Sequence, residues 1–152
     1  MNKKGASLVE LIAVIVIMGV IAGIATLTVT TVIARQRNNS VINGLNNIYE
    51  SAKGMLVQVE AGDYDDNIIV VDNDFCYVSL TTLIDSGNVD GNNYKPNDNE
   101  IYFCYVMNGT SEAFVTIGNS VPNKIKPKST GSTTVDKVLV TFNYSTNKFI
   151  TA

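Results

Sequence analysis

A run of residues without charge, preceded by a single carboxylate, constrains this chain more than any other feature of its sequence. Residues 11–34 contain no Asp, Glu, Lys or Arg, and Glu10 stands directly before them. About 20 apolar residues in a helix suffice to cross the hydrocarbon core of a bilayer. A carboxylate inside such a span costs about 2.5–3.5 kcal/mol on insertion scales, which makes it a functional residue by default. We therefore predict a membrane-spanning helix in which Glu10 has a specific role.

The residues on both sides of Glu10 follow a definite order. A basic pair and Gly5 are followed by two small residues, two aliphatic residues, Glu10 and the apolar run. This order resembles the class III signal and N-terminal helix of type IV pilins and pseudopilins, over residues 1–25. The chain differs from the usual family pattern in having Ala6 where Phe is common, and in having no proline before Pro96. The resemblance implies a pilin-like fold, in which a long N-terminal helix packs on a small antiparallel sheet.

The resemblance also implies how the chain is processed. In that family a membrane aspartic peptidase cleaves after the leader Gly on the cytoplasmic side, and the new N-terminal residue is usually N-methylated. Carried over, residues 1–5 are the leader peptide, cleavage falls between Gly5 and Ala6, and Ala6 is methylated. Glu10 then pairs with the Ala6 ammonium of a neighbouring subunit. A buried ion pair is better attested as a device for register than as a source of net stability, so we assign Glu10 a role in alignment. The alternative is a Glu that snorkels at the helix end with no partner.

Partners and location follow from the same resemblance. The implied partners are other copies of the chain in a helical homopolymer, a prepilin peptidase, the membrane platform of a pilus or secretion assembly machine, and membrane lipid before assembly. The implied location is the cytoplasmic (inner) membrane, crossed once with the head outside the cytoplasm, and then an extracellular surface filament. Charge does not decide the orientation, because basic pairs flank both ends of the span.

Two glycines mark a face of the apolar helix. Gly19 and Gly23 are four positions apart, which gives a small-xxx-small face that permits close approach of a second helix in lipid. Each also weakens the helix by about 1 kcal/mol relative to Ala. We predict that both residues serve helix packing and flexibility. The alternative is the ordinary composition of membrane helices, in which glycine is common.

Beyond the span the apolar pattern changes to one face of an amphipathic helix. Its apolar residues recur at spacings of three and four: Val41, Ile42, Leu45, Ile48, Tyr49, Ala52, Met55, Leu56 and Val59. Gly62 supplies a stop signal. We predict one helix in two parts, with residues 6–34 as transmembrane or filament-core helix and residues 35–62 as its amphipathic continuation on the head.

The head, residues 63–152, has the pattern of an α+β domain. A first strand is predicted at residues 67–71 and a short helix at residues 77–86. A hairpin over residues 100–107 and 113–117 turns at Asn108-Gly109, a strong turn signal. A second hairpin joins residues 135–142 to 148–151. We expect one antiparallel sheet of about three to five strands, with the amphipathic helix segregated to one side.

Composition excludes several kinds of chemistry. The chain has no His, which removes Ser-His and Cys-His catalysis and His-containing metal sites. Cys76 and Cys104 are the only cysteines, and outside the cytoplasm a disulfide between them is the natural interpretation, with two buried thiols as the alternative. The net charge of −3 argues against general nucleic-acid affinity. We predict no catalytic residue, metal or cofactor. The Asp- and Asn-rich residues 85–100 and the basic residues 122–132 are expected to be solvated loops.

Three functional hypotheses follow. The first is a structural protein, a subunit of a type IV pilus-like filament, or a secretion or competence pseudopilin of the same class. The second is a secreted binding protein whose signal peptide ends at Ala25. The third is a permanently anchored surface receptor that does not polymerise. An enzyme is not expected, since no reactive constellation stands out.

Overall fold

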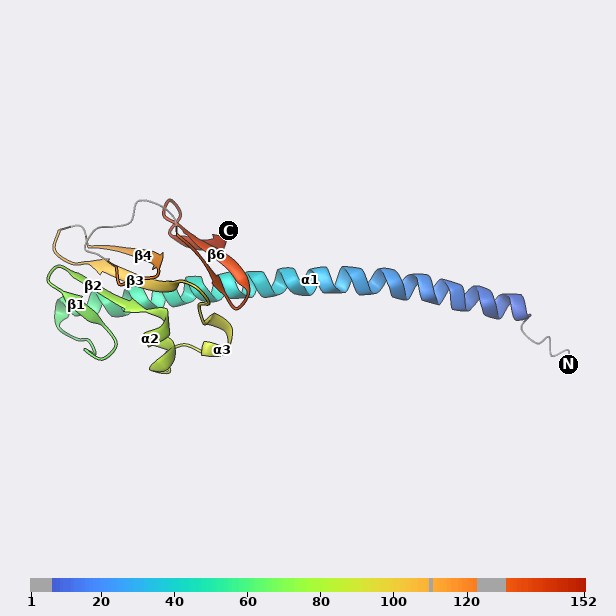
Figure 1. Cartoon of the computed structure of the whole chain (residues 1–152), viewed down its shortest axis with the longest axis horizontal. Coiled ribbons are helices and arrows are strands. Elements are labelled where there is room, and N and C mark those ends of the chain that lie inside the picture. The colour runs from blue at the N-terminus through green and yellow to red at the C-terminus, as the bar shows by residue number, and fades with distance from the viewer. Residues whose placement is uncertain (1–6, 110, 123–130) are drawn as a thin grey trace. The chain divides into compact units, whose positions relative to one another are not determined.

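The computed structural model describes residues 7–109, 111–122 and 131–152, and in residues 25–28 the backbone alone. Contacts divide the chain into two units, Met1–Arg37 and Asn38–Ala152. Helix α1 (Leu8–Val57) begins in the first unit and ends in the second, to which all strands and shorter helices belong (Figure 1). The long N-terminal helix predicted from the sequence is confirmed.

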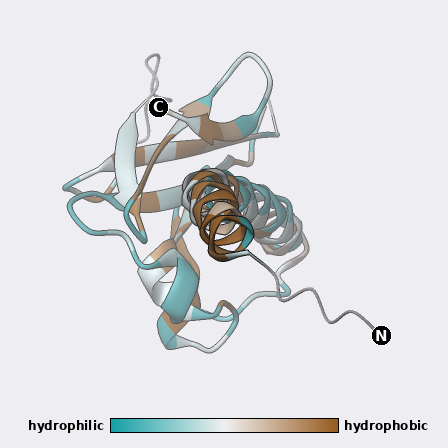
Figure 2. Cartoon of the chain, turned by 90° about the vertical axis from the view of Figure 1, so that its right-hand side faces the viewer, coloured by the Kyte–Doolittle hydropathy of each residue, from teal (hydrophilic) through white to brown (hydrophobic). Residues whose placement is uncertain are grey.

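The first unit contains the uncharged apolar run of residues 11–34. Among the described residues, Leu8–Ala61 is the one helical stretch long and apolar enough to cross a membrane, and its most apolar window has a mean hydropathy of 2.8. The N-terminal turns of this helix are brown in Figure 2. No proline interrupts α1, and Gly19 and Gly23 remain helical. The backbone of the span therefore satisfies its hydrogen bonds internally, as lipid requires.

In the second unit α1 is amphipathic, and its apolar stripe is buried. The buried residues keep the predicted spacing: Val41, Leu45, Tyr49, Ala52 and Leu56. The helix continues as the 3-10 helix η1 (Gln58–Ala61) and stops at Gly62, whose φ is 77°. Glycine adopts this left-handed conformation without a Cβ penalty. The predicted stop signal is confirmed.

Four antiparallel strands form the first sheet, in the order β1-β2-β3-β4. They are β1 (Val70–Asp72), β2 (Phe75–Ser79), β3 (Glu100–Val106) and β4 (Glu112–Gly118). The hairpin predicted around Asn108-Gly109 is confirmed as β3 and β4. The strand predicted at residues 67–71 begins later, because the Asp65 carbonyl accepts the N–H groups of Ile68 and Ile69 in a turn.

Three further strands form a second sheet, in the order β5-β6-β7. They are β5 (Ser132–Val135), β6 (Val138–Asn143) and β7 (Lys148–Thr151). The prediction of one strand over residues 135–142 is wrong, because Asp136 and Lys137 have φ of 44° and 66° and turn the chain back. Two successive positive φ values are typical of a hairpin turn, but this one lacks the usual Gly. The predicted single sheet is therefore two sheets.

Two short helices connect β2 to β3. The helix predicted over residues 77–86 starts only at α2 (Leu80–Asp85), because β2 extends to Ser79. The Ser79 hydroxyl caps α2 by accepting the N–H of Thr82 at 3.0 Å. Helix α3 (Gly91–Tyr94) lies within residues 85–100, where an irregular loop was expected from the sequence.

Both sheets share their core with α1. The ring of Tyr49 on α1 lies 5.3 Å from that of Phe142 on β6. The ring of Phe103 on β3 lies 6.4 Å from that of Phe149 on β7. These aromatic contacts join the helix and the two sheets into one core. A helix packed on antiparallel sheets is an α+β arrangement, and the predicted fold class is confirmed.

Candidate functional site

Glu10 caps the helix to which it belongs. The backbone N–H of Ser7 donates to Oε2 of Glu10 at 3.0 Å, and the backbone N–H of Glu10 donates to Oγ of Ser7 at 3.4 Å. This reciprocal pair is a capping box, which satisfies N–H groups that have no partner within the helix. Ser7 was absent from the sequence-based prediction, although the spacing Ser-x-x-Glu before an apolar run is its signal.

The capping box leaves the Glu10 carboxylate able to accept further hydrogen bonds. The positive end of the helix dipole favours a carboxylate in the first turn by about 0.3–1 kcal/mol. A carboxylate has about four acceptor sites, so the bond from Ser7 leaves capacity for a second donor such as an ammonium. Glu10 therefore has a hydrogen-bond partner within its own chain. Its pairing with a second copy remains a prediction.

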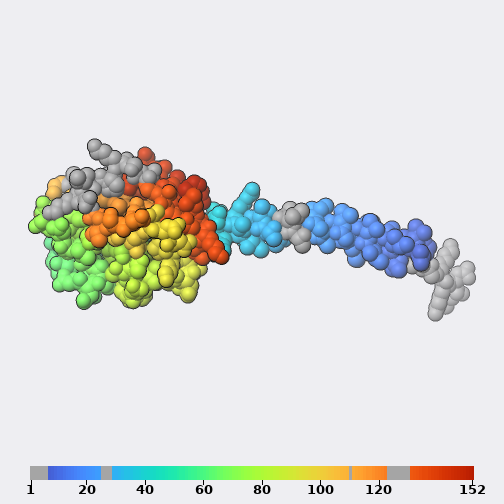
Figure 3. All heavy atoms as spheres, in the orientation of Figure 1, coloured from blue at the N-terminus to red at the C-terminus, as the bar shows by residue number. Residues whose placement is uncertain are grey.

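The apolar helix exposes its side chains. Every described side chain from Ser7 to Ile24 is exposed, and this segment is drawn in blue in Figure 3. Leu8 is 73% exposed and Met18 65%. A Cβ built on Gly19 or Gly23 would meet no atom within 4 Å, so packing within one copy does not require glycine there. Small residues at these positions leave room for a second helix, and their packing role remains a prediction.

The two cysteines do not form the predicted disulfide. Both are free and buried. Across β2 and β3, Cys76 pairs with Tyr105, whereas Cys104 pairs with Tyr77. Because successive residues of a strand point to opposite faces, the two thiols lie on opposite sides of the sheet. The Sγ of Cys76 faces α1 and donates to the Leu56 carbonyl at 3.8 Å. A disulfide needs converging Cβ atoms, so the disulfide prediction is wrong.

We expect both thiols to resist alkylation in the folded protein. Burial raises the pKa of the Cys76 thiol to about 11, and it raises the pKa of the Cys104 thiol as well. Since the thiolate is the reactive form, labelling at pH 8 should be about a hundredfold slower than in the unfolded chain. It should accelerate as the pH rises toward 11 and more thiolate forms. Mass spectrometry of the alkylated protein measures both rates.

The unfolded chain provides the control for this experiment. Without any reductant, it should take up a label on both Cys76 and Cys104, because both are free thiols in the folded protein. A chain that is labelled only after reduction would contain the disulfide and contradict this fold.

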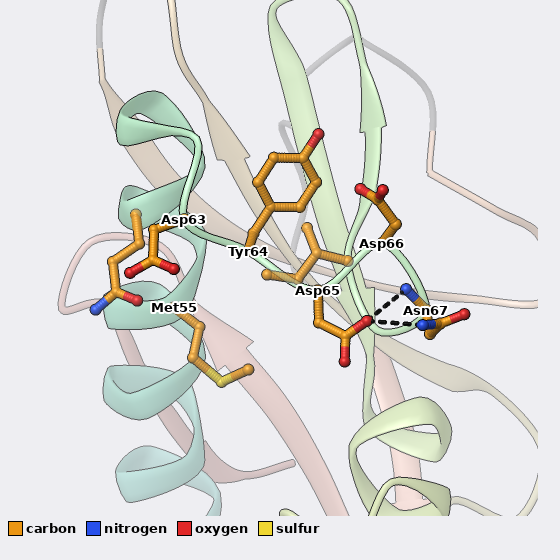
Figure 4. Close-up of a pocket in the computed structure, with 8 residues that line it drawn as sticks. Met55, Asp63, Tyr64, Asp65, Asp66 and Asn67 are labelled. Carbon is orange, nitrogen blue, oxygen red and sulfur yellow. Dashed lines mark hydrogen bonds between the residues drawn. The ribbon is translucent and has the colours of Figure 1, made fainter.

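A shallow pocket beside η1 does not assemble a reactive site. It has a volume of about 600 Å³, and Asp63, Asp65 and Asp66 contribute to its lining. The Asp65 carboxylate already accepts the backbone N–H and the side-chain amide of Asn67, both at 2.9 Å (Figure 4). Asp63 and Asp66 lie on either side of Tyr64 and do not converge. Among the described residues, no three His, Cys, Asp or Glu side chains are placed to hold a metal ion.

Some predicted features fall outside the described residues. These are the cleavage and methylation positions Gly5 and Ala6, and the lysines of the basic loop, Lys124, Lys126 and Lys128. The structure thus describes the candidate site from Ser7 onward: a capped helix start that carries Glu10 and continues into exposed apolar sequence.

Comparison with known proteins identifies the N-terminal segment. No curated protein and no solved structure matches the chain. Residues 1–26 match a family model described as the prokaryotic N-terminal methylation motif. This match includes the basic residues, Gly5, Glu10 and the first turns of the apolar helix, so the resemblance based on these residues is confirmed. The chain carries the signature of type IV pilins and pseudopilins.

Proposed function

We propose that this chain is a structural subunit of a type IV pilus-like filament. A prepilin peptidase cleaves it after Gly5, and the mature chain assembles through its N-terminal helix. The observation that carries the proposal is the combination at the start of α1: the methylation motif, the capped Glu10 and an uncovered apolar helix. A pseudopilin of a secretion or competence system has the same N-terminal helix and is the alternative within this class.

The exposed apolar helix supports this proposal on energetic grounds. Exposure of apolar surface to water costs about 25 cal/mol per Å², so the side chains from Leu8 to Ile24 need a cover. Lipid supplies it before assembly, and the helices of other copies supply it in a filament core. Transfer of the helix from lipid to the filament core changes its hydrophobic free energy little, because lipid tails and packed helices are similarly apolar. The same segment can therefore serve as membrane anchor and as polymer core.

Glu10 gives the helices a preferred register in this scheme. Cleavage after Gly5 creates an α-ammonium at Ala6, directly before the capping residue Ser7. A carboxylate that retains acceptor capacity can bind this ammonium from a neighbouring copy. Only certain axial offsets between two helices bring the two charges together, so the pair selects among offsets that apolar packing alone leaves nearly equivalent.

We expect the protein isolated from sheared surface filaments of its native host to begin at Ala6 and to carry one N-terminal methyl group. Intact mass and N-terminal sequencing of the membrane and sheared fractions test this expectation. A chain that begins at Thr26 would instead be a secreted domain. An intact Met1 would mean a static anchor. Either result would overturn the filament proposal.

A further inference from the structure

Strand β7 presents backbone groups at the outer edge of the second sheet. The N–H of Ala152 donates to the Leu139 carbonyl at 3.1 Å, so this pair is hydrogen-bonded across β6 and β7. In an antiparallel ladder, hydrogen-bonded and non-hydrogen-bonded pairs alternate. Phe142↔Phe149 is therefore a non-hydrogen-bonded pair. The N–H and C=O of Phe149 consequently point away from β6, toward the edge of the sheet.

Asn46 on α1 meets both of these outward groups. Its Oδ1 accepts the N–H of Phe149 at 2.7 Å, and its Nδ2 donates to the Phe149 carbonyl at 3.4 Å. These are the two bonds that a residue of a neighbouring strand would make. One amide side chain therefore occupies the position of a strand partner, from a residue 103 positions away in the sequence.

The opposite edge of the same sheet is covered as well. There the N–H of Asn97 donates to the Thr134 carbonyl at 2.9 Å, and Pro96 forms a bridge with Val135. Segments of the chain itself thus occupy both edges of the sheet. At β5 a backbone segment makes these contacts, whereas at β7 both hydrogen bonds come from one side chain of α1, so a single substitution removes them.

The edge at β7 would otherwise favour strand addition. Aliphatic side chains lie beside it on the outward face, with Leu139 51% exposed and Ile150 41% exposed. A hydrophobic edge with unpaired N–H and C=O groups is a template for pairing with another chain. The hazard increases when copies are held close together, because their effective concentration is then high.

We propose that Asn46 acts as a strand substitute that closes the edge of β7 and prevents a second copy of the chain from adding a strand there. It thereby restricts contacts between copies to other surfaces, which include the apolar helix if the proposed filament function is correct. A simple tether between the sheet and α1 is not its only role, because the packing of Tyr49 on Phe142 already joins them.

The test uses the full chain in detergent micelles, with Asn46→Ala compared with wild type. At low protein concentration, the Phe149 amide should exchange with deuterium about fivefold faster, the factor expected for one net hydrogen bond. At high concentration, exchange of residues 148–152 should slow again, and light scattering should show an additional dimer. Asn47→Ala is the matched control, since Asn47 is the exposed neighbour on the same helix. It should behave as wild type.

A second substitution separates strand addition from other association. The N–H of Thr151 also points outward by the same alternation, and proline is tolerated on an edge strand at such a position. Thr151→Pro added to Asn46→Ala should restore the monomer. If Asn46→Ala fails to fold, Asn46→Ser provides the same test, because its hydroxyl is too short to reach β7. Unchanged exchange, or faster exchange without dimers, would overturn the proposal.

Discussion

Replacement of Glu10 by Gln is expected to abolish filament assembly while the chain remains inserted in the membrane. The Gln side chain still accepts the N–H of Ser7, since a capping box takes Glu or Gln at this position. Only the charge is lost. A buried ion pair deprived of one partner is destabilised by about 3–5 kcal/mol, which corresponds to roughly a hundredfold or more in association. The yield of sheared filaments relative to the membrane pool measures this effect.

Ser7→Ala is the matched control for this experiment. It keeps the Glu10 carboxylate and removes the hydroxyl that caps α1, at a cost of about 1 kcal/mol in helix stability. We expect filament yield to fall only a few-fold, because the charge that we propose selects the register is still present. Normal filaments from Glu10→Gln would remove the alignment role. A loss from Ser7→Ala as large as that from Glu10→Gln would instead mean that assembly depends on the capped helix start and not on the charge alone.

The helix was predictable because its determinants are local. An uncharged run, followed by apolar residues at spacings of three and four and by Gly62, specifies α1 and its end without reference to the rest of the chain. The capping box is equally local, yet the position of Glu10 beside a membrane span directs attention to its charge. The Ser-x-x-Glu spacing explains instead which group the Glu10 carboxylate contacts in a single copy of the chain, namely the backbone N–H of Ser7.

The second sheet was less predictable because its turn breaks the usual sequence rule. Asp136 and Lys137 adopt positive φ without glycine, so the alternating residues on either side look like one strand. Non-Gly residues in this region cost free energy. The turn exists because strands β5 and β6 bury Val135, Val138 and Phe142 in the common core, and that burial depends on contacts distant in the sequence.

The cysteines show the same limit of local information. Whether two strand residues share a face depends on the register between strands, and a shift of one residue moves a side chain to the other face. The sequence predicts a strand at Cys104 but places Cys76 between a strand and a helix, and it does not indicate that Cys76 lies on β2 and pairs with Tyr105. The Asn46–Phe149 contact is likewise invisible in the sequence, because it joins residues 103 positions apart.

Replacement of Gly5 by Leu is expected to leave the full-length precursor in the membrane, with no chain that begins at Ala6. Glycine has no Cβ, so Leu adds a side chain directly before the proposed cleavage site, where the peptidase has to accommodate it. Intact mass of the membrane fraction measures the ratio of precursor to mature chain. We expect this ratio to rise at least tenfold, since one badly placed side chain at the reacting bond commonly costs a hundredfold in rate.

Gly19→Leu makes the same chemical change where the structure has space for it, because a Cβ there meets nothing within 4 Å. Processing of this variant should be normal, even where closer packing of helices in a filament is impaired. If Gly5→Leu were still cut after position 5, the assignment of the prepilin peptidase would be wrong. A product of Gly5→Leu that begins at Thr26 would mean that a different peptidase acts on the apolar segment. Gly5→Leu and Gly19→Leu thus show separately which glycine cleavage requires and which glycine filament assembly requires. The Glu10 experiment alone does not separate cleavage from assembly.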